Sequence, residues 1–357
     1  MRLFKRKILK EILPFIFLGL AFVAGLFLIF NSGGKSFEFK KEQNNIVEGE
    51  NKNTESKTQP EIGNVSPISG IACSDFKRRP VAVMISGDTI TRPLAGLSEA
   101  DLVFEMPVVT DGITRMMAIY VCGNPKEIGS IRSSRHDFIP LAQGIDAIYA
   151  HWGGSHFALD KLKEGVIDNI DALPNPYNTY YRKSGLSAPH NGFTSMERLI
   201  KTIEKLGYRI EGKFEGYAHK ESEVKNSKSG ILVINYPGES KIKYQYDPEK
   251  NSYLRYRAGS KEIDKNNGQQ IEAKNIVILR TEIHQIENEY NSVKVLGSGD
   301  AYIFLDGKQI AAIWKKPDAQ SKLIFYNKDN GREIEFNRGQ IWIEIIQMDQ
   351  GFNWEVG

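Results

Sequence analysis

The chain has 357 residues, 41% of them hydrophobic and 25% charged, a composition typical of a folded protein with room for about two domains. Its net charge of +3 arises from basic residues that precede residue 12, and the remainder is close to neutral. This balance excludes a broadly basic surface, so we predict no nucleic-acid partner.

The N-terminus, residues 1–30, has the pattern of a transmembrane anchor behind a basic cytoplasmic end. Ile12–Phe30 carries no charge and is long enough to cross a bilayer as a helix. Basic residues precede it, so the positive-inside rule places the folded domains outside the cell membrane. A cleaved signal peptide is the alternative, but the apolar run is long and ends without small residues. No cysteine follows it closely, which argues against a lipid-modified N-terminus.

Residues 31–67 are rich in Lys, Glu, Asn and Ser and nearly lack aromatic side chains. Such a segment buries too little apolar surface to offset the entropy lost on ordering. We therefore predict a disordered tether between the membrane and the folded part of the chain.

Residues 68–219 are predicted to form an α/β domain with a mixed sheet, because short buried strands alternate with helices. The expected strands are Pro80–Ile85, Leu102–Met106, Met116–Val121, Glu127–Ile131 and Ala147–Ala150. The expected helices are Arg135–Gln143, one capped by Ser155 that continues to Lys163, and Met196–Leu206, capped by Thr194 and ended by Gly207.

Residues 220–357 are predicted to form a mostly antiparallel β domain. The expected strands are Ile231–Asn235, Ile242–Tyr246, Tyr253–Arg257, Asn275–Leu279, Ala301–Leu305, Gln309–Trp314, Leu323–Tyr326, Glu333–Phe336 and Ile341–Ile346. Asp306-Gly307 and Asn330-Gly331 are two-residue hairpin signals. Trp314 and Trp342 fit core positions better than a sugar-binding platform.

The two cysteines, Cys73 and Cys122, lie in the part predicted to be outside the membrane. An even pair in an oxidising compartment is a disulfide candidate, with two buried free thiols as the alternative. Cys73 precedes the first expected strand and Cys122 ends the third, so pairing of these strands would bring the cysteines within bridging distance.

Polar residues that follow apolar runs are the candidate ligand-binding residues: Arg132, Arg135, His151, Gly153, Gly154, His190 and Asn191. Ligands of open α/β sheets bind beyond strand ends. Two arginines near a helix start would favour a carboxylate or a phosphate, although a solvated pair on a turn is the alternative. The histidines could hold zinc, but hydrogen-bonded histidines in a packed cleft fit the spacing better.

No catalytic group can be assigned from the sequence. Four serines, Ser130, Ser133, Ser134 and Ser155, lie near histidines, but the nucleophile-elbow pattern is absent. Gly153-Gly154 lacks the spacing of a nucleotide-binding loop. We therefore expect no cofactor and no metal, and leave open whether the protein is an enzyme.

Several motifs, in this order along the chain, resemble those of the YerB-like lipoproteins, a bacterial envelope family with a domain of unknown function: Pro80–Ile85, Arg92-Pro93, Gly112–Arg115, Ile128–Arg135, Asp146–Tyr149, His151–Ser155 and Ala188–Asn191. Gly297–Ala301, Trp314-Lys315 and Gly339–Ile343 resemble its second domain. The resemblance implies an extracytoplasmic two-domain protein and no established reaction. Members often end the first strand with a carboxylate, where this chain has Ser86-Gly87, and begin with a lipidated cysteine, absent here.

Three hypotheses for function follow from these patterns. The first is a membrane-anchored envelope protein whose site binds an anionic or cell-wall-related ligand. The second is a hydrolase or transferase on envelope polymers, with His151 or His190 as general acid or base and Arg132 stabilising negative charge. The third is an interaction module that docks an envelope enzyme near the membrane.

Overall fold

The computed structural model describes residues 64–109, 112–287 and 290–357. The predicted anchor, and the predicted tether up to residue 63, lie outside these residues. No helix within the described ranges is both long and apolar enough to span a bilayer.

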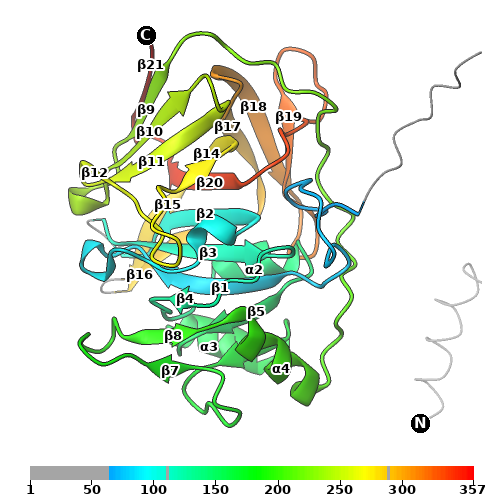
Figure 1. Ribbon diagram of the computed structural model, residues 1–357, viewed down its shortest axis with the longest axis vertical. Helices are drawn as coiled ribbons and strands as arrows, with labels where there is room; N and C mark the ends of the chain where they lie inside the picture. Colours follow the sequence, from blue (N-terminus) through cyan, green and yellow to red (C-terminus); the bar gives the residue numbers. More distant parts are fainter. Residues whose placement is uncertain (1–63, 110–111, 288–289) are drawn as a thin grey trace, which may run out of the picture. The chain divides into compact units, whose positions relative to one another are not determined.

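A ten-stranded mixed sheet is the centre of the fold, in the order β19-β18-β17-β14-β20-β2-β3-β1-β5-β6 (Figure 1). The first half of the chain contributes β1 (Val81–Ser86), β2 (Leu102–Pro107), β3 (Thr114–Tyr120), β5 (Ile148–His151) and β6 (Asn169–Asp171). The second half contributes β14 (Asn275–Thr281), β17 (Gly297–Leu305), β18 (Lys308–Lys316), β19 (Ile324–Asn327) and β20 (Ile341–Gln347).

The two halves of this sheet join where β2 pairs in parallel with β20, with Leu102 opposite Ile341 and Phe104 opposite Ile343. The central strands β1, β2 and β3 are buried along their whole length because both faces of the sheet are covered. In β1, for example, Ala82 and Met84 pack into one core cluster while Val81 packs into the other.

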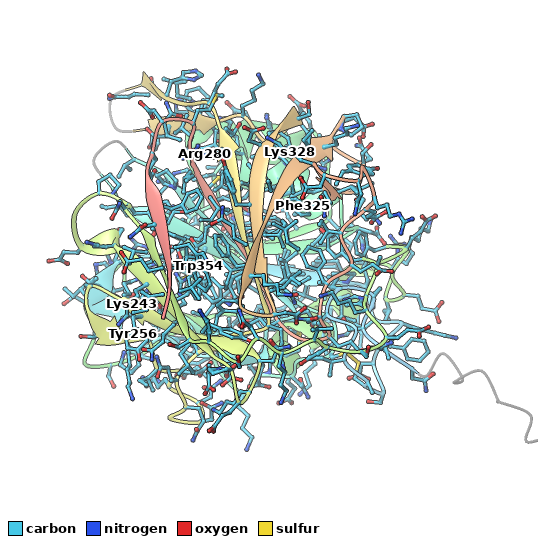
Figure 2. The ribbon with its side chains drawn as sticks, turned by 90° about the horizontal axis from the view of Figure 1, so that it is seen from above. Lys243, Tyr256, Arg280, Phe325, Lys328 and Trp354 are labelled. Carbon is cyan, nitrogen blue, oxygen red and sulfur yellow. A yellow bond between two sulfur atoms is a disulfide. The ribbon has the colours of Figure 1, made fainter. Side chains whose placement is uncertain are left out.

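A second sheet, antiparallel throughout, has the order β12-β11-β10-β9-β21, with β13 also paired to β11. Its strands are β9 (Gly230–Ile234), β10 (Ile242–Asp247), β11 (Ser252–Arg257), β12 (Ser260–Lys261), β13 (Glu272–Ala273) and β21 (Phe352–Val356). Every second residue of β10 is buried, beginning with Ile242, so this sheet covers the large sheet with one face only. Trp354 of β21 contacts Phe304 of the large sheet at a ring-centroid distance of 5.3 Å (Figure 2).

Helices α2 (Phe138–Gln143) and α3 (His156–Lys163) pack into one core cluster, and α4 (Met196–Leu206) packs into the other. Ser155 caps α3 as predicted, because its side chain accepts a hydrogen bond from the amide of Ala158. The predicted cap of α4 is wrong by one residue. Ser195 caps that helix, while Thr194 belongs to a strand and donates to the carbonyl of Thr179.

Smaller elements complete the fold: a three-stranded sheet of β4 (Ile128–Gly129), β8 (Gly192–Thr194) and β7 (Tyr181–Arg182), a hairpin of β15 (Ile283–Glu287) and β16 (Tyr290–Val293), and the 3-10 turns η1 (Thr89–Thr91), η2 (Leu97–Glu99) and η3 (Gly238–Ser240). The Asp306-Gly307 hairpin is confirmed: both residues have positive φ, as a two-residue turn requires, and Leu305 pairs with Lys308. The predicted strand Glu333–Phe336 is wrong, because this segment forms isolated bridges.

The predicted fold class is confirmed as a mixed α/β sheet followed by a mainly antiparallel β region. Trp314 and Trp342 are buried in the core as expected. The predicted disulfide is also confirmed, since Cys73 and Cys122 are bonded with their Cα atoms 5.8 Å apart.

Candidate functional site

A tight loop at the end of β1 carries the carboxylate around which the candidate site is built. Asp88 Oδ2 accepts hydrogen bonds from Ser86 Oγ at 2.8 Å and from Arg132 Nη2 at 3.0 Å. The loop lies directly on β3, because a Cβ atom added to Gly87 would come within 2.3 Å of the Thr114 carbonyl oxygen. Glycine at residue 87 therefore lets the loop turn Asp88 toward Arg132.

Two adjoining hollows open beside this loop. The larger hollow, of about 360 Å³, is lined by residues 87–90, 112–113, 190 and 237–240. The smaller hollow, of about 70 Å³, is lined by residues 131–133, Trp152, Arg182 and Pro189. They meet at the Arg132–Asp88 ion pair, since Arg132 lines the smaller hollow and Asp88 lines the larger one.

Basic and aromatic side chains dominate the smaller hollow. Arg182, on β7, lies over the Trp152 ring at 4.3 Å and donates through Nη1 to Asn191 Oδ1 at 2.6 Å. The Nε atom of Arg132 is buried without a hydrogen-bond partner. Behind the lining, Arg115 donates through Nη1 to the Ser133 carbonyl at 2.9 Å. The hollow thus presents guanidinium groups and an aromatic face, and none of the described residues that line it carries a carboxylate.

The larger hollow is mixed in character. Asp88 and Glu239 supply carboxylates, and the Glu239 carboxylate accepts a hydrogen bond from Thr89 Oγ1. The Nδ1 atom of His190 lies 3.9 Å from Asp88 Oδ2. Ile90 and Ile113 are 72% and 45% exposed and form apolar parts of the wall. The hollow can therefore accept hydrogen bonds from hydroxyl groups while covering apolar surface.

The structure brings three of the predicted ligand residues to these hollows. Arg132 lines the smaller hollow, His190 lines the larger one, and Asn191 positions Arg182. Arg135 instead lies against the Tyr290 ring at 5.2 Å.

His151 and the glycines that follow it lie behind the site. His151 is 1% exposed, with Nδ1 2.8 Å from the Gly153 carbonyl oxygen and Nε2 3.3 Å from Asn169 Oδ1. Burial lowers the pKa of His151, which favours the neutral ring. Gly153, at φ +60°, turns the chain back onto this histidine. Gly154 packs against Ser134 and Leu159.

Three residues of the site were missed by sequence reasoning: Asp88, Trp152 and Arg182. The motif resemblance led us to expect a carboxylate at the end of the first strand; residues 86 and 87 are Ser and Gly, and Asp88 supplies a carboxylate one residue later. Arg182 lies on a strand of two residues, too short for an alternation pattern. Gly192 is a sequence feature that relates to the position of Trp152. A Cβ atom at residue 192 would come within 2.6 Å of the Trp152 ring, so glycine at this residue lets the ring lie there.

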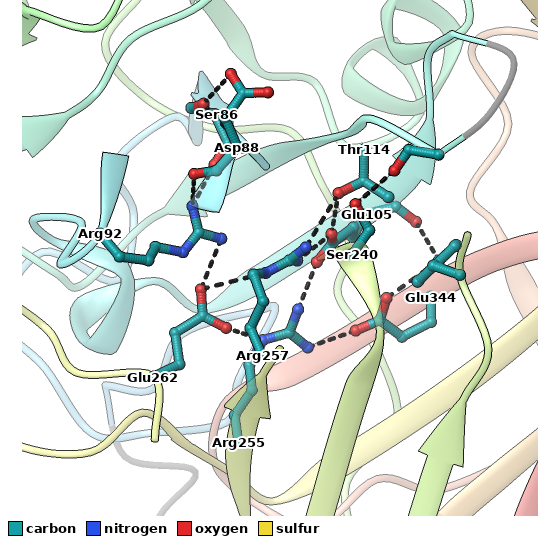
Figure 3. A network of polar contacts seen from close by, with 12 residues as sticks. Ser86, Asp88, Arg92, Glu105, Thr114, Ser240, Arg255, Arg257, Glu262 and Glu344 are labelled. Atoms are coloured by element: carbon teal, nitrogen blue, oxygen red, sulfur yellow. Dashed lines mark hydrogen bonds and ion pairs between the residues drawn. The ribbon is translucent and has the colours of Figure 1, made fainter. Parts of the chain in front are cut away.

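A buried ionic cluster lies next to the site and ties the two halves of the chain together (Figure 3). Its members are Arg92, Arg255, Arg257, Glu105, Glu262 and Glu344. Arg92 forms the link, because Nη1 donates to the Asp88 carbonyl at 2.9 Å and Nη2 lies 2.8 Å from Glu262 Oε1. Burial lowers the pKa of Arg92 to about 10. The charges of the cluster balance, because it contains three cations and three carboxylates. This balance indicates a structural role.

Comparison with known proteins places the chain in a family. Residues 68–209 match the N-terminal domain, and residues 232–343 the C-terminal domain, of the Protein of unknown function (DUF3048) family. The chain belongs to the DUF3048 family. This confirms the resemblance found in the motifs of the sequence.

A relative of this chain is a protein of Bacillus subtilis (strain 168) described as "Putative lipoprotein YerB". It is 29% identical over 289 residues, which cover 79% of this chain and 86% of that protein. The crystal structure of the YerB protein from Bacillus subtilis is similar, with a TM-score of 0.74 and 26% sequence identity, covering 82% of this chain and 99% of that chain.

In the described residues of this DUF3048 protein, histidine, cysteine and acidic side chains do not gather in groups of three that could hold a metal ion.

Proposed function

We propose that this DUF3048 protein is an extracytoplasmic envelope protein, anchored to the membrane by residues 1–30, whose two hollows bind an anionic, cell-wall-related ligand. The Cys73–Cys122 disulfide supports an oxidising location outside the cytoplasm. The lipoprotein description of the relative supports attachment to a membrane.

The observation that carries the proposal is the composition of the smaller hollow. Arg132 and Arg182 line it with Trp152. Asp88 pairs with Arg132 from the adjoining hollow, whereas Arg182 forms no ion pair with a carboxylate of the described residues. A guanidinium presents paired N–H donors to a carboxylate or phosphate and forms stronger hydrogen bonds with these anions than with neutral groups. A volume of about 70 Å³ admits a few water molecules, or one anionic group in their place, because one water occupies about 30 Å³ in the liquid.

The larger hollow would hold the uncharged remainder of the ligand. The carboxylates of Asp88 and Glu239 can accept hydrogen bonds from sugar hydroxyls, and Ile90 and Ile113 can cover the apolar face of a ring. A glycan carrying one anionic group would place its charge on one side of the Arg132–Asp88 pair and its sugar on the other.

Binding of matched sugars to the full chain in mild detergent tests this proposal. N-acetylmuramic acid, which carries a carboxylate, should bind more tightly than neutral N-acetylglucosamine in isothermal titration calorimetry. Arg182→Gln should weaken binding of the acid by about tenfold or more, because a hydrogen bond to a charged group contributes about 1.5–3 kcal/mol. Arg332→Gln, at an exposed arginine outside the hollows, is the matched control.

Equal affinity for the acidic and neutral sugars, or wild-type affinity in Arg182→Gln, would contradict the proposal. The thermal midpoint of Arg182→Gln should stay close to that of the wild type. Its side chain is exposed, and a cation–π contact at an exposed site contributes about 0.5–1 kcal/mol.

A second candidate function, a hydrolase or transferase, is favoured by the placement of His190. Its Nδ1 atom lies 3.9 Å from Asp88 Oδ2 beside the larger hollow, so a shift of less than about 1 Å would let this carboxylate accept a hydrogen bond from the ring and orient it as a general base. Release of soluble sugars from purified cell walls by the wild type, and its loss in His190→Gln, would establish this activity. Unchanged cell walls would leave binding as the function.

A further inference from the structure

The charge around the smaller hollow points to a more specific ligand. Resting on the proposed function, we infer that the site selects a doubly charged phosphate monoester over singly charged anions such as a carboxylate or a sulfate ester.

Three guanidinium groups surround this hollow. Arg132 and Arg182 line it, and Arg115 contacts it from behind through the carbonyl of Ser133. Arg115 lies on β3 opposite Ser86, which places it beside the loop that carries Asp88. The three cations therefore come from three separate segments of the chain.

The carboxylate at this site compensates only one of these charges. Asp88 pairs with Arg132 at 3.0 Å. Across residues 64–109, 112–287 and 290–357, neither Arg115 nor Arg182 forms an ion pair with a carboxylate. Three guanidiniums and one carboxylate leave the group with a net charge of about +2, which matches the charge of a phosphate monoester near neutral pH.

The excess positive charge should affect ligand binding strongly, because Arg115 is shielded from water. Its side chain is 5% exposed, and its Nε atom is buried without a hydrogen-bond partner. Burial lowers the pKa of Arg115, and the neighbouring Arg135 and Arg132 lower it further. Asp88 raises this pKa but forms its ion pair with Arg132, so an anion that enters the hollow would stabilise a buried cation that has no direct carboxylate partner in the described residues.

Charge and shape then distinguish between anions. The electrostatic interaction with the site grows in proportion to ligand charge, so a dianion gains about twice as much as a monoanion. A phosphate group also has three terminal oxygens, which suits donors that reach the hollow from Arg132 on one side and Arg182 on the other. Arg182 is held in place for this contact by Trp152 and Asn191.

Two esters of the same shape separate charge from geometry. N-acetylglucosamine 6-phosphate is largely a dianion at pH 7.5, whereas N-acetylglucosamine 6-sulfate is a monoanion at every pH used. In titration calorimetry with the full chain in mild detergent, the phosphate ester should bind roughly tenfold more tightly than the sulfate ester at pH 7.5. At pH 5, below the second phosphate pKa of about 6, this advantage should disappear.

The quantity to compare between pH values is the ratio of the affinity for the phosphate ester to the affinity for the sulfate ester. Ionisable groups of the protein also change their charge with pH, and they act on both esters. The charged or titratable groups near the two hollows, among the described residues, are Arg115, Arg132, Arg135, Arg182, His190, Asp88 and Glu239. A protein group that changes its charge between the two pH values acts on the binding of both esters, and the ratio of the two affinities largely removes this effect. The wild-type ratio therefore tests the inference without any variant.

Arg115→Gln tests the source of the selectivity. Removing one cation lowers the net charge of the group from about +2 to about +1, so the ratio should fall from roughly tenfold to roughly threefold. Arg332→Gln should keep the wild-type ratio. If the two esters bind equally at pH 7.5, the inference is overturned while the proposed function stands. If neither ester nor the carboxylated sugar binds, the proposed function falls as well.

Discussion

Replacing Arg255 by Met should remove the central cation of the buried ionic cluster. The guanidinium of Arg255 is fully buried and contacts Glu105 at 2.5 Å, Glu262 at 2.7 Å and Glu344 at 2.6 Å. It also lies 3.9 Å from the centre of the Trp342 ring. These contacts join strands of both sheets, so the cluster should report on the stability of the whole fold.

The expected loss of stability follows from what remains after the substitution. Three buried carboxylates would share two cations, Arg92 and Arg257, which leaves one negative charge uncompensated. Removing one partner of a buried ion pair costs about 3–5 kcal/mol, and the lost contact with Trp342 adds up to about 2 kcal/mol. A total of roughly 3–7 kcal/mol is a large part of the 5–15 kcal/mol that typically stabilises a folded protein.

Urea unfolding of the full chain in mild detergent, followed by tryptophan fluorescence, measures this loss. Adding Glu344→Gln to Arg255→Met should recover part of it, because the uncompensated carboxylate is then removed. Arg332→Met, at an exposed position, should change stability by less than about 0.5 kcal/mol. A loss below about 1 kcal/mol for Arg255→Met, or no recovery in the double variant, would refute the structural role assigned to the cluster.

Two further predictions concern other parts of the fold. Reducing the Cys73–Cys122 disulfide should lower the free energy of unfolding by up to about 4 kcal/mol, since it closes a loop with a sequence separation of 49; an unchanged urea midpoint would contradict this. Burial raises the pKa of Asp137 to about 7, above its unfolded value of about 3.9, so wild-type stability should fall as pH rises between these values. Asp137→Asn should therefore gain stability relative to wild type over that range and level off above it; a pH-independent difference would refute the shift.

Local sequence patterns were sufficient for most elements of the large sheet. The apolar runs near Val81, Leu102 and Ile341 predicted strands because a strand covered on both faces has no polar side. Asp306-Gly307 predicted its turn because few residue pairs tolerate two positive φ angles. The strand expected over Glu127–Ile131 is present as the shorter β4, but β7 and β8 show no usable alternation, so the sheet that positions Arg182 was not predicted.

The candidate site was predicted only in part, because local patterns do not show how side chains from separate segments come together. Arg132, His190 and Asn191 were found because they follow apolar runs or a proline. His151 satisfied the same rule, but its ring is buried against Gly153 and Asn169. A pattern of apolar residues shows where a strand ends, but the direction of the next side chain depends on what packs around it.

The sequence by itself determined the strands of the core, the α/β and β character of the two halves, the cysteine pair and the family. These follow from burial, backbone preference and motif order, which neighbouring residues encode. The tertiary structure alone decided that β2 pairs with β20 and that Arg255 meets Glu105, a residue 150 positions away. It also brought Arg115, Arg132 and Arg182 together around one hollow. Such contacts depend on which distant surfaces fit each other once the chain is packed, and no local pattern records that choice.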